Sequence, residues 1–519
     1  MTARDLQNVG RDSDKSFLSN IFSESPEKRT ALSLFVLLAI VVFGLLLRLN
    51  ELGTYGLFGD EIYSVLVATG KGDPELIAFD SIRPVYFFLL KLWMSAGDSE
   101  EWLRLFSVIF GTLNIALTYY LAQLAAGRKV GLVAATLMAL SPMEVHYCQL
   151  VRMYTLGSSL ALLGAIAIIK ALQTEKRIFV LLWAAIRTLM VWTLPLTATL
   201  LAVDIILCFA KERKNKLVPL VSACFVIVLA LYACFAWKMP QLTATSSYDD
   251  WRYGLPVPQV TDALMMFVNF TSTALPIQEC RGPVEGGLFA VLYSFAILFM
   301  IAYSLLPAFK ERWLIWCSTW ALFPVLMAWA ASQFTASFVI TRYLMFASPF
   351  VFICVAAGWI EIWKLKRLRA LAIVAAALYS SIMWMNLAHL YTHPVSEDWR
   401  QISSFIQNNE KPGDNVVIWN YHSQYLFNYY YRGKNKTYDV IVDHVLNKEK
   451  TDLIDVSLDM PGLNAVHGRT WFVIREAPQD WLLASMIYKL FMKHLEKNYK
   501  VITHEKLGRT DLYLVTAKD

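Results

Sequence analysis

The sequence predicts a mainly α-helical, polytopic membrane protein with a small α/β domain at its C-terminal end. Hydrophobic residues make up 57% of the 519 residues, which is more than the core of a soluble protein needs. They gather in long runs separated by short basic loops, whereas from about Ser396 the composition becomes that of a soluble domain. We therefore expect a tail over 1–30, a transmembrane domain over 31–390 and an outer domain over 391–519.

The first apolar run, from Ala31 to Leu49, follows a polar stretch that carries several Lys and Arg residues. It is too long for the core of a signal peptide and has no small-residue cleavage site after it. We expect it to remain as an anchor, with the N-terminus in the cytoplasm and the protein in the inner (plasma) membrane.

The stretch from Pro84 to Trp93 is apolar but short. As a helix it covers about 15 Å at 1.5 Å per residue, against a hydrocarbon core of roughly 30 Å. It is therefore predicted to lie along the membrane surface, so that the chain is still outside when Arg104 begins the next span.

With that stretch left out, the basic loops at 127–129, 175–177, 211–216, 310–312 and 364–369 all fall on the cytoplasmic side. Counting it as a span would turn each of those loops outward. The prediction is about eleven spans, at 31–49, 104–126, 130–142, 153–171, 178–192, 194–210, 217–237, 287–306, 313–330, 343–361 and 370–388.

The net charge of +6 is explained by these basic loops, so no nucleic-acid partner is expected. The seven cysteines show no metal-binding or disulfide pattern, and most of them lie in apolar runs. Only Cys148 and Cys280 fall near outer loops, where a disulfide between them is one alternative.

The C-terminal domain alternates strand-like and helical segments after the turn at Lys411-Pro412-Gly413-Asp414. This alternation is typical of a small α/β domain. The predicted elements are strands at 415–419, 438–442, 470–474 and 512–515, and a helix at 480–496.

The predicted topology brings polar residues from distant parts of the chain to the outer face, where an acidic pair near lipid is costly to keep. This convergence indicates a functional site at the membrane surface. It contains Asp60-Glu61, Arg83, the loop from His146 to Tyr154, the loop from Lys238 to Pro283, Thr341-Arg342-Tyr343 and the residues beyond Tyr391.

Several of these segments resemble, in order, the landmarks of the family 39 glycosyltransferases, which include protein O-mannosyltransferases and lipid A aminoarabinose transferases. The resemblance covers about 31–430 and rests on Gly59-Asp60-Glu61, Arg83-Pro84-Val85-Tyr86-Phe87, Glu101 to Ser107, Ser141-Pro142-Met143, Val151 to Tyr154, Thr341-Arg342-Tyr343 and Asp398-Trp399-Arg400. It implies a GT-C fold, a polyprenyl-phosphate-linked sugar as donor, and a glycan, lipid or protein as acceptor.

The chemistry of such a transfer assigns roles to the residues. Asp60 is the predicted general base for the acceptor hydroxyl, and Glu61 has a supporting role. The leaving lipid phosphate gains negative charge, which fixed guanidinium groups stabilise, so no metal or other cofactor is required. The predicted phosphate-binding residues are Arg83, Arg152 and Arg342, and the predicted substrate-lining residues are His146, Tyr147, Tyr154 and Tyr343.

Each residue also has a structural interpretation. Asp60 could cap a helix that begins at Glu61, and Arg104 and Arg342 could only extend to the lipid headgroups. Tyr147 and Tyr154 could belong to an interfacial aromatic belt.

The alternatives for the whole protein are a lipid-linked polysaccharide polymerase or ligase, and a lipid-linked sugar flippase or transporter. Transporters carry charges at mid-membrane and repeated halves, whereas the charges of this chain are expected to gather on one side. Bacterial relatives commonly have His-Pro-Pro where this chain has Arg83-Pro84-Val85, which leaves the role of Arg83 open.

Overall fold

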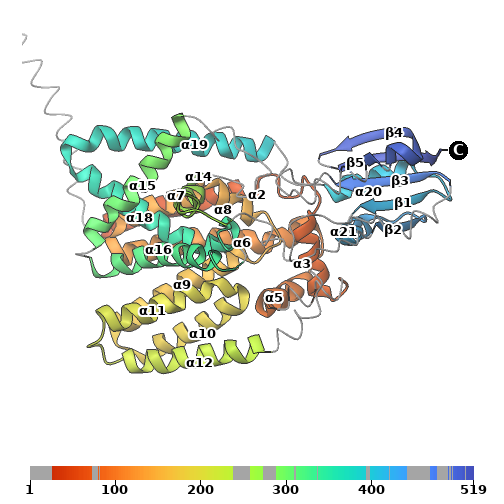
Figure 1. The fold of residues 1–519 in the computed structure, drawn as a ribbon. Helices are drawn as coiled ribbons and strands as arrows, with labels where there is room; N and C mark the ends of the chain where they lie inside the picture. The colour runs from red at the N-terminus through yellow and green to blue at the C-terminus, as the bar shows by residue number, and fades with distance from the viewer. Residues whose placement is uncertain are drawn as a thin grey trace, which may run out of the picture.

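A computed structural model describes residues 26–72, 77, 80, 82–237, 257–272, 288–308, 311–335, 337–392, 398–419, 421–440, 468–475, 489, 492–493, 495–508 and 510–518. These residues form a helical bundle with a five-stranded sheet at one end (Figure 1). The predicted Cys148–Cys280 disulfide involves a residue outside this set, and Cys148 itself is a buried free thiol.

Each of the eleven predicted spans coincides with a helix. The helices are α2 (Pro26–Leu49), α6 (Glu100–Ala126), α7 (Arg128–Leu140), α9 (Tyr154–Thr174), α10 (Arg177–Thr193), α11 (Ala198–Lys211), α12 (Val218–Trp237), α15 (Leu288–Ala308), α16 (Arg312–Ser332), α18 (Ser348–Lys364) and α19 (Arg369–Thr392). Among the described residues, six helices are long and apolar enough to cross a membrane, or up to seven if one bent pair is counted as a span. The protein is a multi-pass membrane protein with the predicted mainly helical fold.

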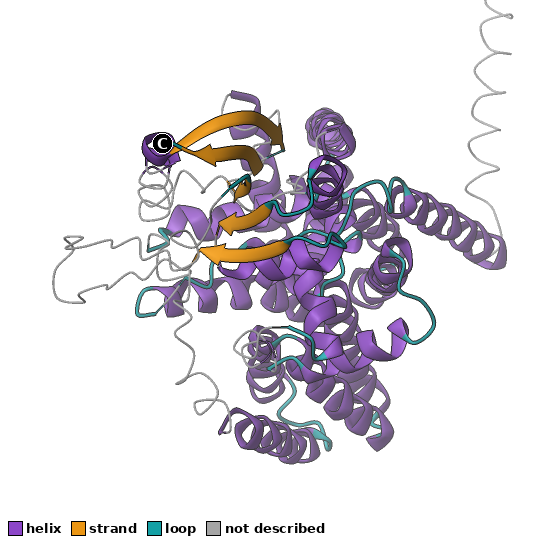
Figure 2. Cartoon of the chain, turned by 90° about the vertical axis from the view of Figure 1, so that its right-hand side faces the viewer, coloured by secondary structure: helices purple, strands orange, loops and turns teal. Residues whose placement is uncertain are grey.

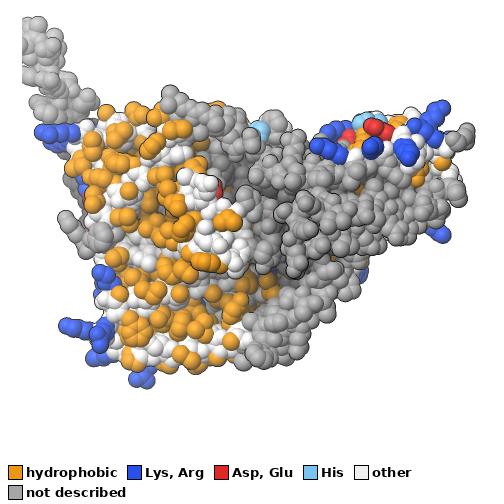
Figure 3. Space-filling view, viewed as in Figure 1, with side chains coloured by type: hydrophobic (Ala, Val, Ile, Leu, Met, Phe, Trp, Pro, Cys, Tyr) orange, Lys and Arg blue, Asp and Glu red, His pale blue; other side chains and the backbone are white. Residues whose placement is uncertain are grey.

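The flank of the bundle is apolar, as lipid contact requires. Phe35 and Leu38 of α2 are 70% and 60% exposed, and Phe295 of α15 is 70% exposed. Figure 3 shows hydrophobic side chains over this flank, with Lys and Arg gathered at the end remote from the sheet. A large exposed apolar surface of this kind is stable only when another apolar phase covers it.

The bent pair consists of α7 and α8 (Pro142–Cys148), whose axes differ by 59°. Pro142 has no amide hydrogen to continue the helix, and Ser141 caps α8 by accepting a hydrogen bond from the amide of Glu144. Carbonyls at the end of α7 are satisfied by buried Arg48, which donates to Met138 O and Ala139 O at 3.1 Å each. The bend turns α8 and its aromatic side chains inside the bundle.

One expectation about the charges is wrong. Arg187 of α10 and Asp204 of α11 form an ion pair inside the bundle, and both side chains are fully buried. The indole nitrogens of Trp183 and Trp320 also donate to Asp204, at 2.7 and 2.8 Å. The charges of this chain therefore do not all lie on one side, and this pair cross-links α10, α11 and α16.

Two short helices, α3 (Gly59–Thr69) and α5 (Pro84–Met94), lie at the end of the bundle nearest the sheet, whereas α14 (Val260–Ser272) packs against α8, α15 and α17 (Thr341–Leu344). Figure 1 shows α3 and α5 at this end, between the bundle and the sheet domain. α5 is the helix predicted for Pro84 to Trp93, whereas α14 lies in a segment that was predicted only as a loop. The polypeptide segments of the predicted site therefore meet at one end of the bundle.

The C-terminal domain contains helices α20 (Trp399–Asn409) and α21 (Tyr421–Tyr430) and a sheet with strand order β2-β1-β3-β5-β4. Strands β1 (Asn415–Trp419), β2 (Lys436–Val440) and β3 (Thr470–Arg475) are parallel, and β5 (Thr510–Ala517) and β4 (Tyr499–Leu507) are antiparallel additions. Four of the five strands were predicted, although the strand predicted at 438–442 begins two residues after the observed start of β2. Strand β4 was not predicted. Figure 2 shows the sheet in front of the bundle end.

Candidate active site

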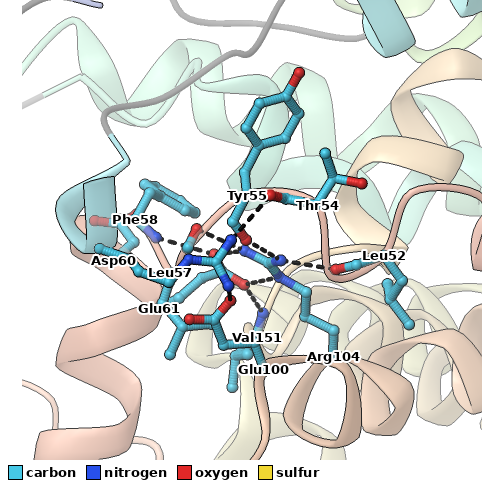
Figure 4. A network of polar contacts seen from close by, with 12 residues as sticks. Leu52, Thr54, Tyr55, Leu57, Phe58, Asp60, Glu61, Glu100, Arg104 and Val151 are labelled. Carbon is cyan, nitrogen blue, oxygen red and sulfur yellow. Dashed lines mark hydrogen bonds and ion pairs between the residues drawn. The ribbon is translucent and has the colours of Figure 1, made fainter. Parts of the chain in front are cut away.

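The second carboxylate of the acidic pair, Glu61, lies in a closed network (Figure 4). Its side chain is fully buried and pairs with Arg104 of α6 through two parallel bonds, from Nε to Oε1 at 2.9 Å and from Nη2 to Oε2 at 2.8 Å. The backbone amides of Phe58 and Val151 donate to the same carboxylate at 3.1 and 2.9 Å. Four donors thus surround Glu61, as a buried carboxylate requires.

Arg104 also fixes the loop that precedes α3. It donates to the backbone carbonyls of Leu52 at 2.7 Å, Tyr55 at 2.8 Å and Gly56 at 3.0 Å. The headgroup interpretation of Arg104 is therefore wrong, because its guanidinium points into the protein and is buried. Its partner Glu61 lies 43 residues earlier in the sequence.

Asp60 has a different environment, although it is the next residue along the helix. It does not cap α3, because the helix begins at Gly59 and Phe58 is the N-cap residue. The backbone carbonyl of Asp60 accepts hydrogen bonds from Ser64 Oγ at 3.0 Å and from Arg152 Nη1 at 3.1 Å. Among the described residues, none donates a hydrogen bond to its side-chain carboxylate, which is half-buried.

Guanidinium groups surround this open carboxylate. Burial alone would raise the pKa of Asp60, but the positive charges of Arg152, Arg342, Arg475 and Arg83 outweigh burial and hold the pKa below its ordinary value of 3.8. The structure thus brings the three predicted arginines to the predicted base. Arg475, at the end of β3, was not predicted, because a strand residue more than 400 positions away gives no sequence signal of this proximity.

Arg152 and Arg83 keep some of their donors unused within the described part of the chain. Arg152 is 8% exposed and donates through Nη1 to Ser64 Oγ at 3.1 Å, while its buried Nε has no hydrogen-bond partner among the described residues. Arg83, also 8% exposed, pairs with Asp80 through Nη1, and no described residue makes a hydrogen bond with its buried Nε. Arg342 lies 5.5 Å from the ring centre of Tyr343 and close to Asp60, so it does not simply extend to the headgroups.

Aromatic side chains line the inner side of this cluster. The rings of His146 and Tyr147 lie 5.1 Å apart, and so do those of Tyr147 and Tyr154. Tyr147 and Tyr154 are 3% and 1% exposed, so the interpretation as a lipid-facing belt is wrong. The guanidinium of Arg152 is 5.9 Å from the Tyr154 ring centre, and the buried hydroxyl of Tyr154 has no hydrogen-bond partner in the described part of the chain. Tyr343, half-buried, is adjacent to Arg342.

A metal site is not evident near the acidic pair. Among the described ranges, no three His, Cys, Asp or Glu side chains come together as metal ligands. The positive charge of the cluster comes instead from guanidinium groups, whose geometry suits phosphate oxygens.

The fold matches those of known membrane glycosyltransferases. ArnT from Cupriavidus metallidurans in the apo state aligns over 92% of this chain and 97% of its own, with 11% identity and a TM-score of 0.54. The same protein bound to undecaprenyl phosphate aligns over 94% and 98%, with 12% identity and a TM-score of 0.51.

An oligosaccharyltransferase from Archaeoglobus fulgidus in the apo form aligns over 76% of this chain, with 14% identity and a TM-score of 0.51. The chain spans 63% of that protein's length. No protein-family model matches the sequence, and no curated protein does. The chain therefore has the GT-C fold, as the resemblance implied.

Proposed function

We propose that this protein is a membrane glycosyltransferase that moves a sugar from a polyprenyl-phosphate donor to an acceptor hydroxyl, with inversion at the anomeric carbon. The observation that carries the proposal is an open carboxylate, Asp60, surrounded by guanidinium groups, of which Arg152 and Arg83 each keep a buried Nε that has no hydrogen-bond partner among the described residues. A buried donor without a partner costs about 1–3 kcal/mol, so a site that keeps several of them is suited to an anionic ligand.

In the proposed reaction, the Asp60 carboxylate and the arginine guanidinium groups have separate roles. The acceptor oxygen forms a bond to the anomeric carbon and gives its proton to the Asp60 carboxylate, while the bond from that carbon to the phosphate oxygen breaks. The lipid phosphate leaves with one more negative charge than it carried in the donor. Arg152, Arg342 and Arg83 stabilise that charge, most strongly where water is excluded.

The other predicted residues shape the site. Glu61 positions α3 through its pair with Arg104, while His146, Tyr147, Tyr154 and Tyr343 line the sugar and acceptor sites. The acceptor class, whether a glycan, a lipid or a protein, is decided by chemistry outside this cluster.

The neighbours support the class of ligand. ArnT was solved with undecaprenyl phosphate, and the oligosaccharyltransferase, at 12% identity and a TM-score of 0.50, was solved with a tethered acceptor peptide. We propose that the C-terminal domain and the site lie on the periplasmic or extracytoplasmic side of the inner membrane, with the N-terminus in the cytoplasm.

The transporter alternative gains nothing from the buried pair Arg187–Asp204. Each polar atom of Asp204 is already occupied by Arg187, Trp183 or Trp320. A mobile charge that carries a substrate must exchange partners, whereas this pair is locked by packing.

Binding of the lipid phosphate tests the donor site. Undecaprenyl phosphate should raise the melting temperature of the detergent-solubilised protein, since a ligand that binds only the folded state stabilises it. Loss of one charge-assisted contact costs about 1.5–3 kcal/mol, so Arg152→Ala or Arg342→Ala should weaken binding roughly 10- to 150-fold. Exposed Arg128, which begins α7, provides the control variant Arg128→Ala. Wild-type binding by both site variants would contradict the proposal.

Turnover tests the base. Protein in nanodiscs is supplied with polyprenyl-phosphate-linked sugars, and release of polyprenyl phosphate is measured with and without candidate acceptors. Asp60→Asn keeps the shape of the side chain and removes its basicity, so it should lower turnover about 10²- to 10⁴-fold while preserving lipid-phosphate binding. Turnover within tenfold of wild type would refute the assignment of Asp60.

A further inference from the structure

The C-terminal domain makes hydrogen bonds to the loop that precedes Asp60. Tyr430, the last residue of α21, accepts a hydrogen bond from the backbone amide of Leu57 at 2.7 Å. Its hydroxyl donates to Glu100 Oε1, at the start of α6, at 2.6 Å. One phenol thus joins the C-terminal domain, the loop and a helix of the bundle.

Arg400 of α20 makes a second connection to the same two partners. It donates through Nη1 to Glu100 Oε2 at 2.9 Å and through Nη2 to the carbonyl oxygen of Thr54 at 2.9 Å. Glu100 is therefore shared between Arg400 and Tyr430, one carboxylate oxygen to each. Both connections are made to backbone atoms of the loop, at Thr54 and Leu57, so they fix its path whatever its side chains are.

Close packing accompanies these hydrogen bonds. A Cβ atom at Gly56 would lie 2.6 Å from Asp398 Oδ1 and 2.8 Å from Arg400 Cβ, and one at Gly59 would lie 3.2 Å from Leu426 Cδ1. The two glycines allow the C-terminal domain to approach the backbone on either side of Leu57. The close packing of the C-terminal domain on this loop therefore depends on the residues of both.

Arg104 holds the opposite side of the same loop, through the carbonyls of Leu52, Tyr55 and Gly56. The loop from Leu52 to Phe58 is consequently fixed between a guanidinium from the bundle and a guanidinium and a phenol from the C-terminal domain. It leads directly into Gly59 and Asp60, so its position sets that of the Asp60 carboxylate.

We propose that the C-terminal domain is a working part of the active site, in which Arg400 and Tyr430 are positioning residues that hold Asp60 in register with the donor. This inference rests on the proposed function. Neither residue touches the arginines that bind the phosphate in that proposal. Their loss should therefore impair the chemical step more than donor binding.

The size of the effect follows from the contacts. Tyr430→Phe removes the acceptor of the Leu57 amide and the donor to Glu100 and keeps the ring. A displacement of about 1 Å in a reacting group can lower a rate roughly 100-fold. We expect kcat to fall at least tenfold in Tyr430→Phe and Arg400→Ala. Arg400→Lys, which can keep the contact to Glu100 but not the fork to Thr54, should recover part of the loss.

Matched controls lie on the same helix or just after it. Tyr429→Phe removes the same hydroxyl one residue earlier, from a ring 4.9 Å away from that of Tyr430. Arg432→Ala removes an exposed arginine whose side chain, within the described part of the chain, donates to the carbonyls of Asn428 and Tyr431. Both controls should retain kcat within twofold of wild type.

The experiment measures kcat and KM for the donor, undecaprenyl phosphate binding, and hydrogen exchange of the peptide that contains Leu57, all on the full chain at a temperature where each variant is folded. We expect lower kcat, donor binding within twofold of wild type, and faster exchange of the Leu57 amide. Unchanged kcat in Tyr430→Phe and Arg400→Ala, or unchanged exchange, would overturn the inference and leave the proposed function standing. A wild-type protein that neither binds the lipid phosphate nor transfers sugar would overturn both.

Discussion

Replacing the carboxylate by an amide should lower the stability of the protein at Glu61 but lower its turnover at Asp60. Replacement of the Glu61 carboxylate by an amide removes its negative charge and places an NH₂ group against donors from Arg104, Phe58 and Val151. Breaking a buried ion pair by altering one partner typically costs about 3–5 kcal/mol, because the remaining charge is left buried and uncompensated. Glu61→Gln should therefore destabilise the protein by about that amount.

Asp60→Asn should leave stability almost unchanged. In the described part of the chain no hydrogen bond to its carboxylate is lost, since none is made. The asparagine side chain has nearly the same size and shape as aspartate, so the packing of α3 should be unchanged. The expected loss is in turnover, about 10²- to 10⁴-fold.

Denaturant titration of the purified protein in detergent, followed by turnover at a temperature where both variants are folded, separates the two effects. Glu101→Gln is the matched control, because Glu101 is exposed and lies next to the end of the same network. If Glu61→Gln unfolded at the same denaturant concentration as Glu101→Gln, the four hydrogen bonds to Glu61 would contribute little and the network described above would be wrong.

Three further predictions concern charge and packing. Because arginines hold the pKa of Asp60 below its ordinary value of 3.8, kcat/KM should decline at a lower pH than it would with an unperturbed aspartate as base. Arg152→Ala should raise that pKa, so the decline should begin at higher pH than in the wild type. Asp204→Asn should destabilise the bundle by about 3–5 kcal/mol and leave lipid-phosphate binding by the folded protein unchanged. Gly164→Ala places a Cβ 2.8 Å from the fixed Arg187 guanidinium and should cost about 1–3 kcal/mol of unfolding free energy.

Each of the three predictions has a control and an outcome that would contradict it. A pH profile of Arg152→Ala identical to wild type would mean that its charge does not act on Asp60. Asp98→Asn, at an exposed position, should melt like wild type, and so should Gly157→Ala, whose Cβ would lie 3.5 Å from Leu194 Cδ2 in ordinary contact. Equal melting of Asp204→Asn or Gly164→Ala and its control would contradict the packing argument.

The spans and the acidic pair could be predicted because their signals are local. A membrane span can be recognised from about 20 consecutive residues, and the acidic pair Asp60-Glu61 follows such an apolar run closely in the sequence. The pairing of Glu61 with Arg104 could not be predicted, because the sequence does not show which of many outer-face cations a buried carboxylate meets. Tyr430 lies 373 residues from its partner Leu57, and tyrosines in a polar domain carry no sign of that contact.

Other errors have equally physical causes. Arg187 and Asp204 each occur singly in an otherwise apolar run, so hydropathy reads both segments as ordinary spans and conceals the ion pair between them. Strand β4 was missed because most of its residues are exposed, which gives neither an apolar run nor a clear alternation. Helix α14 was missed because its segment had been assigned as one outer loop.

Adjacent residues on a helix point about 100° apart, and this geometry explains how two neighbouring carboxylates serve different purposes. Glu61 faces inward, where four donors already occupy its two carboxylate oxygens. Asp60 faces the cluster made by segments around 83, 152 and 342, which supply charge without occupying its oxygens. Each of those segments lies at or just before the start of a different helix, α5, α9 or α17, so a site of this kind forms only when these helices are packed together. In the proposed reaction, Glu61 therefore acts through the position of α3, and Asp60 acts through its own basicity.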